Sequence, residues 1–295
     1  MTFVLEPRGP FTLASAARFI AGWPPTARPE ATGSEPVVRL AFLVDDWSGH
    51  AGVELRQERE HGPVRVTVVE STAADPERVR AQAARIVSLD HDGSGYGALG
   101  EREPVIGRLA RTSGWLRPVL FHSPYEAACW AVISTRLRQP VAARLRDELS
   151  GAHGGQIRLG DGKFVTFPAP ERLLAVREAP GLPAVKLERL HAIAHAALEG
   201  RLDRERLLAA PPDVALARLR DLPGIGPFWS EAILLRAVGT CDVLASGERG
   251  MRGRAAAVFD APGVAVDDAA YAALAESWRP FRTWVSVLLR ASVPG

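Results

Sequence analysis

The residues that could do chemistry are concentrated in residues 222–248, which read LPGIGPFWSEAILLRAVGTCDVLASGE. Near the start of this stretch two glycines flank one isoleucine, and apolar residues at helical spacing stand before and after them. One proline precedes the first glycine, and another follows the second at a position where its missing N–H costs nothing. The pattern predicts a helix, a tight turn at residues 223–226 and a second helix from Pro227.

The turn itself is a candidate anion site. Gly224 and Gly226 can adopt positive φ values and permit close approaches that a side chain would forbid. Backbone N–H groups at a bare glycine turn and at a helix N-terminus bind anions, so we expect phosphate at Gly224, Ile225 and Gly226. A turn with a purely structural role is the alternative for so short a motif.

Glu248 is the candidate reactive group. It follows Gly226 by 22 residues, in a predicted loop that also contains Asp242, Ser246 and Gly247. This arrangement resembles the helix-hairpin-helix DNA glycosylase superfamily, in which the hairpin holds the DNA backbone and a carboxylate in the next loop does the chemistry. Within the superfamily it looks closest to the 3-methyladenine DNA glycosylase II (AlkA-like) branch. The pattern of that branch reads roughly LPGIGPWTAE, with an Asp where this chain has Glu248.

Three further segments carry the same resemblance. Residues 121–149 look like the family's helix and DNA-probing loop, and residues 167–173, FPAPERL, resemble a family linker. Residues 278–284, WRPFRTW, resemble the family's closing helix. The segments occur in family order and at family distances, so together they indicate the fold.

The resemblance implies that Glu248 is the catalytic carboxylate of a DNA repair glycosylase. Hydrolysis of an N-glycosidic bond passes through an oxocarbenium-like sugar, which a negative charge beneath C1′ stabilises. The same carboxylate can orient or deprotonate the attacking water. The damaged nucleotide must first be flipped out of the duplex. Phe228 stands where the superfamily's bifunctional lyases carry a lysine, so we expect a monofunctional hydrolase of base excision repair.

The resemblance also assigns a loop that probes the duplex. Thr135, Arg136 and Leu137 occupy the turn that, in the family, fills the gap left by the extruded base. An arginine head can stack on bases and also meet phosphate, which suits Arg136 to this role. A solvated loop arginine is the alternative.

The surroundings of Glu248 are basic. Arg249, Arg252 and Arg254 surround it in the sequence, and we expect some of them to face phosphate and one to pair with the carboxylate. Glutamate in place of the family's aspartate adds one methylene and displaces the carboxylate. In a preorganised site such a displacement can lower the rate by about 100-fold.

The predicted base pocket departs from the family pattern. Phe228 and Trp229 follow the hairpin, Ala232 replaces an aromatic residue, and Arg290 stands where the family often has another. Stacking and cation–π attraction hold a cationic alkylated base, whereas an arginine repels it. Three hypotheses follow: a glycosylase for an alkylated, neutral or bulky lesion; a catalytically weak or inactive DNA-damage-binding protein; and a fold used for something other than DNA.

The elements that must position these residues predict an α+β fold, mainly helical, with a small N-terminal antiparallel sheet. Alternating or β-rich runs predict strands at residues 2–6, 37–45, 52–57 and 64–70. Asp75 is placed to cap a helix that Pro76 opens, and residues 11–19 read as a short helix or arm. Later helices are expected at residues 187–198, 251–259 and 274–291. We expect two domains: residues 1–112, α+β, and residues 113–295, the all-α glycosylase domain.

Composition sets bounds on this interpretation. The 295 residues are 47% hydrophobic and 24% charged, which is typical of soluble globular proteins. The net charge of +2 permits nucleic acid as a partner without arguing for it, because binding depends on a local basic face. Two cysteines exclude a four-cysteine iron–sulfur cluster and favour a reducing cytoplasm. We therefore expect a cytoplasmic, nucleoid-associated monomer that binds double-stranded DNA, with no membrane segment and no obligate protein partner.

Two histidine patterns raise the question of a metal. His91, Asp92 and His122 fit no known ligand spacing, and His191 and His195 at i and i+4 have neither the intervening glutamate of a zinc helix nor an evident third ligand. The glycine-rich residues 151–165 contain no GxxxxGK[ST] motif and read as a hairpin or loop. We expect neither a metal nor a cofactor.

Overall fold

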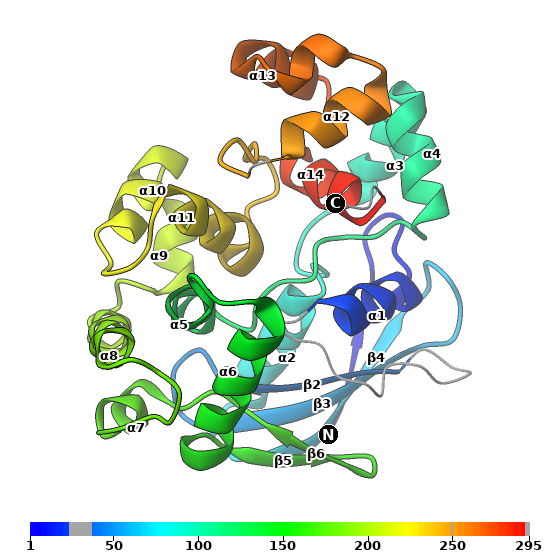
Figure 1. Cartoon of the computed structure of the whole chain (residues 1–295). Coiled ribbons are helices and arrows are strands. Elements are labelled where there is room, and N and C mark those ends of the chain that lie inside the picture. Colours follow the sequence, from blue (N-terminus) through cyan, green and yellow to red (C-terminus); the bar gives the residue numbers. More distant parts are fainter. Residues whose placement is uncertain (24–36, 249, 293–295) are drawn as a thin grey trace.

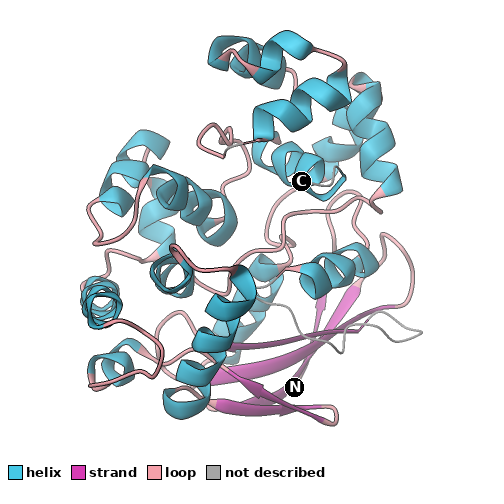
Figure 2. Cartoon of the chain, in the orientation of Figure 1, coloured by secondary structure: helices cyan, strands magenta, loops and turns pink. Residues whose placement is uncertain are grey.

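The computed structural model describes residues 1–23, 37–248 and 250–292. Within them the chain is α+β and mainly helical, as predicted, with a four-stranded and a two-stranded antiparallel sheet at one end of the molecule (Figures 1 and 2). The C-terminal helices lie at the opposite end from the sheets (Figure 1). Over the described residues, no helix is long and apolar enough to cross a membrane.

The four-stranded sheet contains β1 (Thr2–Leu5), β2 (Val37–Leu43), β3 (His50–Gln57) and β4 (Val64–Ser71) in the order β1-β4-β3-β2. All neighbouring strands are antiparallel: short connections join the pairs β2–β3 and β3–β4, and β1 pairs with β4, from which it is distant in sequence. The four strands confirm the sequence prediction, and β3 begins two residues before its predicted start.

Each face of the sheet is covered differently. Helices α1 (Leu13–Gly22) and α2 (Pro76–Ile86) share one hydrophobic cluster with Leu40, Phe42 and Val53. The opposite face, at Ala41, packs against a hairpin of β5 (Gln156–Leu159) and β6 (Gly162–Val165). The Asp75 carboxylate accepts the Glu77 N–H at 2.9 Å, which confirms the predicted cap of α2.

A helical body follows the sheet. Its members are α5 (Pro124–Ser134), α6 (Gln139–His153), α7 (Pro170–Leu174), α8 (Ala184–Leu198), α9 (Arg204–Ala209), α10 (Pro212–Arg220), α11 (Pro227–Ile233) and a π-helical continuation (Leu234–Val238). Helix α5 lies at the centre, because every residue from Pro124 to Ile133 is buried. A single hydrophobic cluster joins α5 to α6, α8, α10 and α11.

The third group combines distant parts of the chain. Helices α3 (Ser94–Arg102) and α4 (Pro104–Thr112) pack with α12 (Met251–Phe259), the 3₁₀ turn Pro262–Ala265, α13 (Asp268–Glu276) and α14 (Arg282–Ser292). Buried aromatic residues, among them Tyr96, Trp278 and Trp284, form its centre. The helices of residues 94–112 thus pack across the predicted boundary at 112/113, and the two-domain division remains a proposal.

One predicted helix is wrong. Residues 274–291 were expected to form a single last helix, but α13 ends at Glu276 and α14 begins at Arg282. Pro280 accounts for the break, because it donates no backbone N–H and disfavours the helical conformation in the residue before it. The break matters for the site, since Arg279 and Arg282 flank Pro280.

Candidate functional site

The turn between α10 and α11 has the positive φ expected of the glycine motif at Gly224 but not at Gly226. Gly224 has φ +89°, and an added Cβ would lie 3.1 Å from Arg189 Cδ and 3.4 Å from Val132 Cγ2. Position 224 therefore requires glycine for both conformation and space. Gly226 has φ −90° and precedes α11, and an added Cβ there would meet no heavy atom within 4 Å. Openness rather than strain characterises position 226.

Of the backbone N–H groups in the turn, one is used within the turn and two are available to a ligand. The Ile225 N–H donates to the Leu222 carbonyl at 3.0 Å, and the Ile225 side chain is buried. Ile225 therefore holds the turn. The N–H groups of Gly224 and Gly226 have no acceptor within residues 1–23, 37–248 and 250–292, so they are available at the start of α11.

Glu231, on α11, binds the loop that carries Glu248. Its Oε1 accepts from the Ser246 N–H at 2.9 Å and the Ser246 hydroxyl at 3.0 Å, and its Oε2 accepts from the Gly247 N–H at 2.8 Å. A Cβ at Gly247 would lie 3.1 Å from Glu231 Oε2, so glycine permits this close approach. Burial raises the pKa of Glu231, and the nearby Glu248 carboxylate acts in the same direction against the hydrogen bonds.

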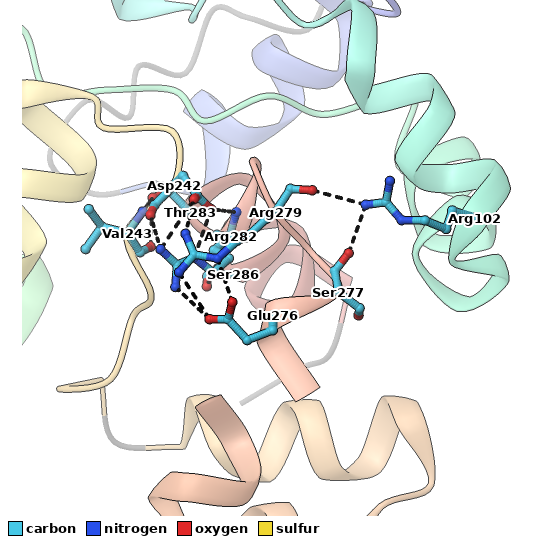
Figure 3. Close-up of polar contacts among 9 residues, drawn as sticks. All are labelled: Arg102, Asp242, Val243, Glu276, Ser277, Arg279, Arg282, Thr283 and Ser286. Atoms are coloured by element: carbon cyan, nitrogen blue, oxygen red, sulfur yellow. Dashed lines mark hydrogen bonds and ion pairs between the residues drawn. The ribbon is translucent and has the colours of Figure 1, made fainter. Parts of the chain in front are cut away.

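The other end of the same loop is tied to α14 (Figure 3). Arg282 Nε donates to Asp242 Oδ1 at 2.8 Å, and Arg282 Nη2 donates to the Asp242 carbonyl at 2.6 Å. The Thr283 hydroxyl donates to the Val243 carbonyl at 2.9 Å. Arg279 approaches the second Asp242 oxygen at 2.6 Å from a more exposed position. The loop that leads to Glu248 is thus fixed both to α11 and to α14.

Glu248 pairs with an arginine that is distant in sequence. Arg290 Nη1 donates to Glu248 Oε1 at 2.8 Å, and the Glu248 side chain is only 18% exposed. The predicted neighbours behave differently: Arg252 pairs with Asp268 at 2.5 Å, and Arg249 lies outside the described residues. The interaction recorded at Glu248 therefore joins its loop to α14.

A small cavity of about 40 Å³ lies beside Glu248. Phe228, Ala232 and Arg290, three of the four predicted pocket residues, line it together with Glu231 and Glu248. It shares Phe228, Ala232, Arg236 and Arg290 with a groove of about 950 Å³. Trp229, the fourth predicted residue, lines that groove.

The groove contains residues that sequence reasoning missed. Aromatic side chains of Phe19, Trp23, Phe121 and Trp130 line it, so its walls are richer in aromatic residues than the sequence after the hairpin suggested. Phe19 lies on α1 and Trp23 follows its end. No local pattern connects α1 with α11, and only the tertiary fold brings them together.

Arg236 was also missed, although it lies in the predicted second helix. Its Nε and Nη2 donate to the Val119 carbonyl at 3.2 and 2.6 Å, and its guanidinium lies 4.4 Å from the Trp23 ring centroid and 5.0 Å from that of Phe19. Burial lowers the pKa of Arg236 to about 9, and the positive charge of Arg290 acts in the same direction.

The predicted probing loop joins α5 to α6. Arg136 has φ +60°, an uncommon conformation for a residue with a side chain, and Arg136 and Leu137 are exposed. The Thr135 hydroxyl donates to the Ala131 carbonyl at 2.6 Å and so is occupied at the end of α5. Lys186 supports the loop, since its Nζ donates to the carbonyls of Ile133 and Thr135 at 2.6 and 2.8 Å.

Three residues of the histidine patterns contact residues outside those patterns. His122 Nδ1 lies 3.0 Å from Glu126 Oε2, Asp92 pairs with Arg8, and His191 Nε2 lies 3.0 Å from the Val176 carbonyl. Across the part of the chain that the structure describes, no three His, Cys, Asp or Glu side chains are grouped so as to hold a metal ion.

Comparison with known proteins supports the resemblance. The chain is 26% identical over 154 residues to the DNA-3-methyladenine glycosylase of Bacillus subtilis, with 51% of each chain covered. It is 29% identical over 186 residues to the DNA-3-methyladenine glycosylase 2 of Escherichia coli, with 61% of each covered. The matches thus span between half and two thirds of these relatives. No family model matches the chain.

The fold has a solved counterpart. The structure of a 3-methyladenine DNA glycosylase from Archaeoglobus fulgidus matches with a TM-score of 0.73 and 22% identity, covering 97% of this chain and 96% of that one. The hairpin, the carboxylate loop and these likenesses support the resemblance to the helix-hairpin-helix DNA glycosylase superfamily. Within the superfamily, its sequence relatives are 3-methyladenine DNA glycosylases.

The two arginines that share Asp242 give a matched test of the carboxylate loop. Replacing Arg282 by methionine leaves the partly buried Asp242 carboxylate and carbonyl without their main donor, so we expect the free energy of unfolding to fall by about 2 kcal/mol. Arg279→Met removes the more exposed donor, and its loss should be clearly smaller. Urea denaturation of both variants makes the comparison. Equal losses would contradict the assignment of Arg282 as the main tie.

Proposed function

We propose that the protein is a monofunctional DNA glycosylase of base excision repair, with Glu248 as its catalytic carboxylate. The observation that carries the proposal is the position of Glu248. It lies beside a cavity, on a loop that Glu231 binds to the helix leaving the hairpin. One helix thereby sets the distance between the candidate phosphate site and the candidate reacting carboxylate.

The chemistry follows from a single carboxylate. Departure of the base leaves an oxocarbenium-like sugar, and the Glu248 charge stabilises it when C1′ lies near the carboxylate oxygens. The oxygen of Glu248 that faces the sugar can also accept a proton from the attacking water. No step requires a second acid if the leaving base needs no proton or receives one from solvent.

A lyase step is not expected. Schiff-base chemistry needs an amine at the reacting carbon, and Phe228 stands where the superfamily's lyases carry lysine. The chain has only two lysines, Lys163 and Lys186. Lys163 lies on β6, and Lys186 holds the end of α5.

Double-stranded DNA carrying a damaged base is the proposed partner of a monomeric enzyme. The N–H groups of Gly224 and Gly226 and the start of α11 bind a phosphate, and Ile225 keeps the turn in shape. Arg136 or Leu137 fills the gap left by the flipped nucleotide, which offsets an unstacking cost of a few kcal/mol. Arg249 and Arg252 are proposed to meet the backbone near the reacting nucleotide.

Release of free base tests the catalytic role. The substrates are otherwise identical duplexes with one methylated, deaminated or oxidised base, incubated with wild type and with Glu248→Gln under single-turnover conditions. We expect the rate of release to fall by at least about 100-fold in the variant, because the stabilising charge is lost. Affinity for an abasic duplex should be retained. Equal release by both proteins would exclude Glu248, and no release of any base would contradict the proposed activity.

A substitution at Gly226 tests the phosphate site without disturbing the fold. Aspartate fits there sterically, because an added Cβ meets no heavy atom within 4 Å and φ is −90°. The new carboxylate should repel phosphate and weaken duplex binding by about tenfold or more at low salt. Gly151→Asp, at an equally open position on α6, is the control and should bind like wild type. Unchanged affinity of Gly226→Asp would place the phosphate contact elsewhere.

A further inference from the structure

We propose that the base site selects uncharged bases that present carbonyl oxygens, rather than cationic alkylated purines, and that Arg236 is the residue that reads the carbonyl. This inference rests on the proposed function, since it names the class of base that the same site accepts. It is carried by an unusual feature: a buried arginine without a carboxylate partner at the boundary between cavity and groove.

Arg236 is held as a charged donor. It is 8% exposed, and two of its nitrogens bind one neutral acceptor, the Val119 carbonyl. Its ring contacts with Phe19 and Trp23 fix the plane of the guanidinium. Within residues 1–23, 37–248 and 250–292, Nη1 has no recorded partner and no carboxylate pairs with Arg236. The Nη1 nitrogen therefore remains for a ligand.

The two carboxylates near Arg236, those of Glu231 and Glu248, already have other hydrogen-bond partners. Both oxygens of Glu231 accept from the loop at Ser246 and Gly247, and Glu248 pairs with Arg290. Within the described residues, no ion pair therefore neutralises Arg236 at the boundary, and the Glu248 carboxylate acts on it without such a pair. A cationic base placed there meets a like charge in a poorly hydrated site, whereas a carbonyl oxygen meets a fixed donor.

The walls suit a neutral ring. Phe228 lines both the cavity and the groove, and Trp23 and Trp229 line the groove, so a planar base has stacking surfaces that do not depend on charge. The cavity beside Glu248, at about 40 Å³, holds only water-sized molecules. A base must therefore lie at the groove end of the boundary, against Arg236, and Arg290 must leave Glu248 to admit the sugar.

Measuring affinity for duplexes that cannot be hydrolysed tests recognition of the base independently of how readily that base leaves the sugar. A 2′-fluoro substituent on the sugar makes the nucleotide resist hydrolysis, so binding can be measured without base release. Each duplex carries, on this sugar, one of five bases: hypoxanthine, 8-oxoguanine, uracil, 7-methylguanine or an undamaged base. We expect the wild type to bind at least one of the three neutral oxo lesions tenfold or more tighter than the undamaged duplex, and to show no such preference for 7-methylguanine. Tighter binding of 7-methylguanine, or equal binding of all duplexes, would overturn the inference.

The variant Arg236→Gln assigns the selectivity to one residue. It should remove the preference for the neutral lesion while leaving affinity for the undamaged duplex unchanged. Arg204→Gln is the control for loss of a largely buried arginine, because Arg204 donates its Nε to the Val238 carbonyl, pairs with Asp90 and Glu205, and lines neither the cavity nor the groove. Retention of the preference in Arg236→Gln would overturn the assignment. Release assays on the cleavable duplexes keep the two proposals apart: absence of any release contradicts the enzyme, while the binding order decides the inference.

Discussion

The hydrogen bonds from the loop of Glu248 to the Glu231 carboxylate are the constraint on which the site depends. Glu231 lies one turn inside the helix that leaves the hairpin, and its two oxygens take the N–H groups of Ser246 and Gly247. A buried carboxylate that accepts several donors is rigid, because each donor fixes its orientation. The same helix thus carries the candidate phosphate site at one end and holds the loop of Glu248 at its side.

The second tie, from Arg282 to Asp242, fixes the loop to α14. Helix α14 also carries Arg290, so the Arg290–Glu248 pair is a further contact between α14 and the loop that Glu231 binds to α11. These contacts give a physical reason for glutamate at the position where the family has aspartate. The longer side chain reaches a guanidinium on α14, and the loop behind it is fixed at both ends.

Sequence patterns predicted the local structure well where the signal was local. The alternation in β4 and the glycine at 224 each reflect a requirement of the backbone itself. The break at Pro280 was also present in the sequence, but the apolar spacing on either side of it masked the proline. The packing of residues 94–112 against the C-terminal helices was beyond such reasoning, because it depends on contacts distant in sequence.

The residues of the candidate site likewise fall into those that the sequence predicted and those that only the structure revealed. Motif spacing predicted Glu248 and the pocket residues, and the structure brings Phe228, Ala232 and Arg290 to one cavity beside Glu248. Glu231 and Arg236 were not found, because their roles come from partners on other segments: a loop for Glu231, and Val119 with two aromatic rings for Arg236. Buried charges of this kind have no sequence pattern of their own.

Glu231 is the residue on which the position of the Glu248 loop depends most directly. The decisive measurement is the single-turnover rate of base release by Glu231→Gln, which keeps the size of the side chain but replaces one acceptor oxygen by a donor. We expect the rate to fall by about 100-fold, with affinity for abasic duplex unchanged, because the loop carrying the carboxylate shifts. A variant that releases base at the wild-type rate would show that the loop is positioned without Glu231 and would contradict the account.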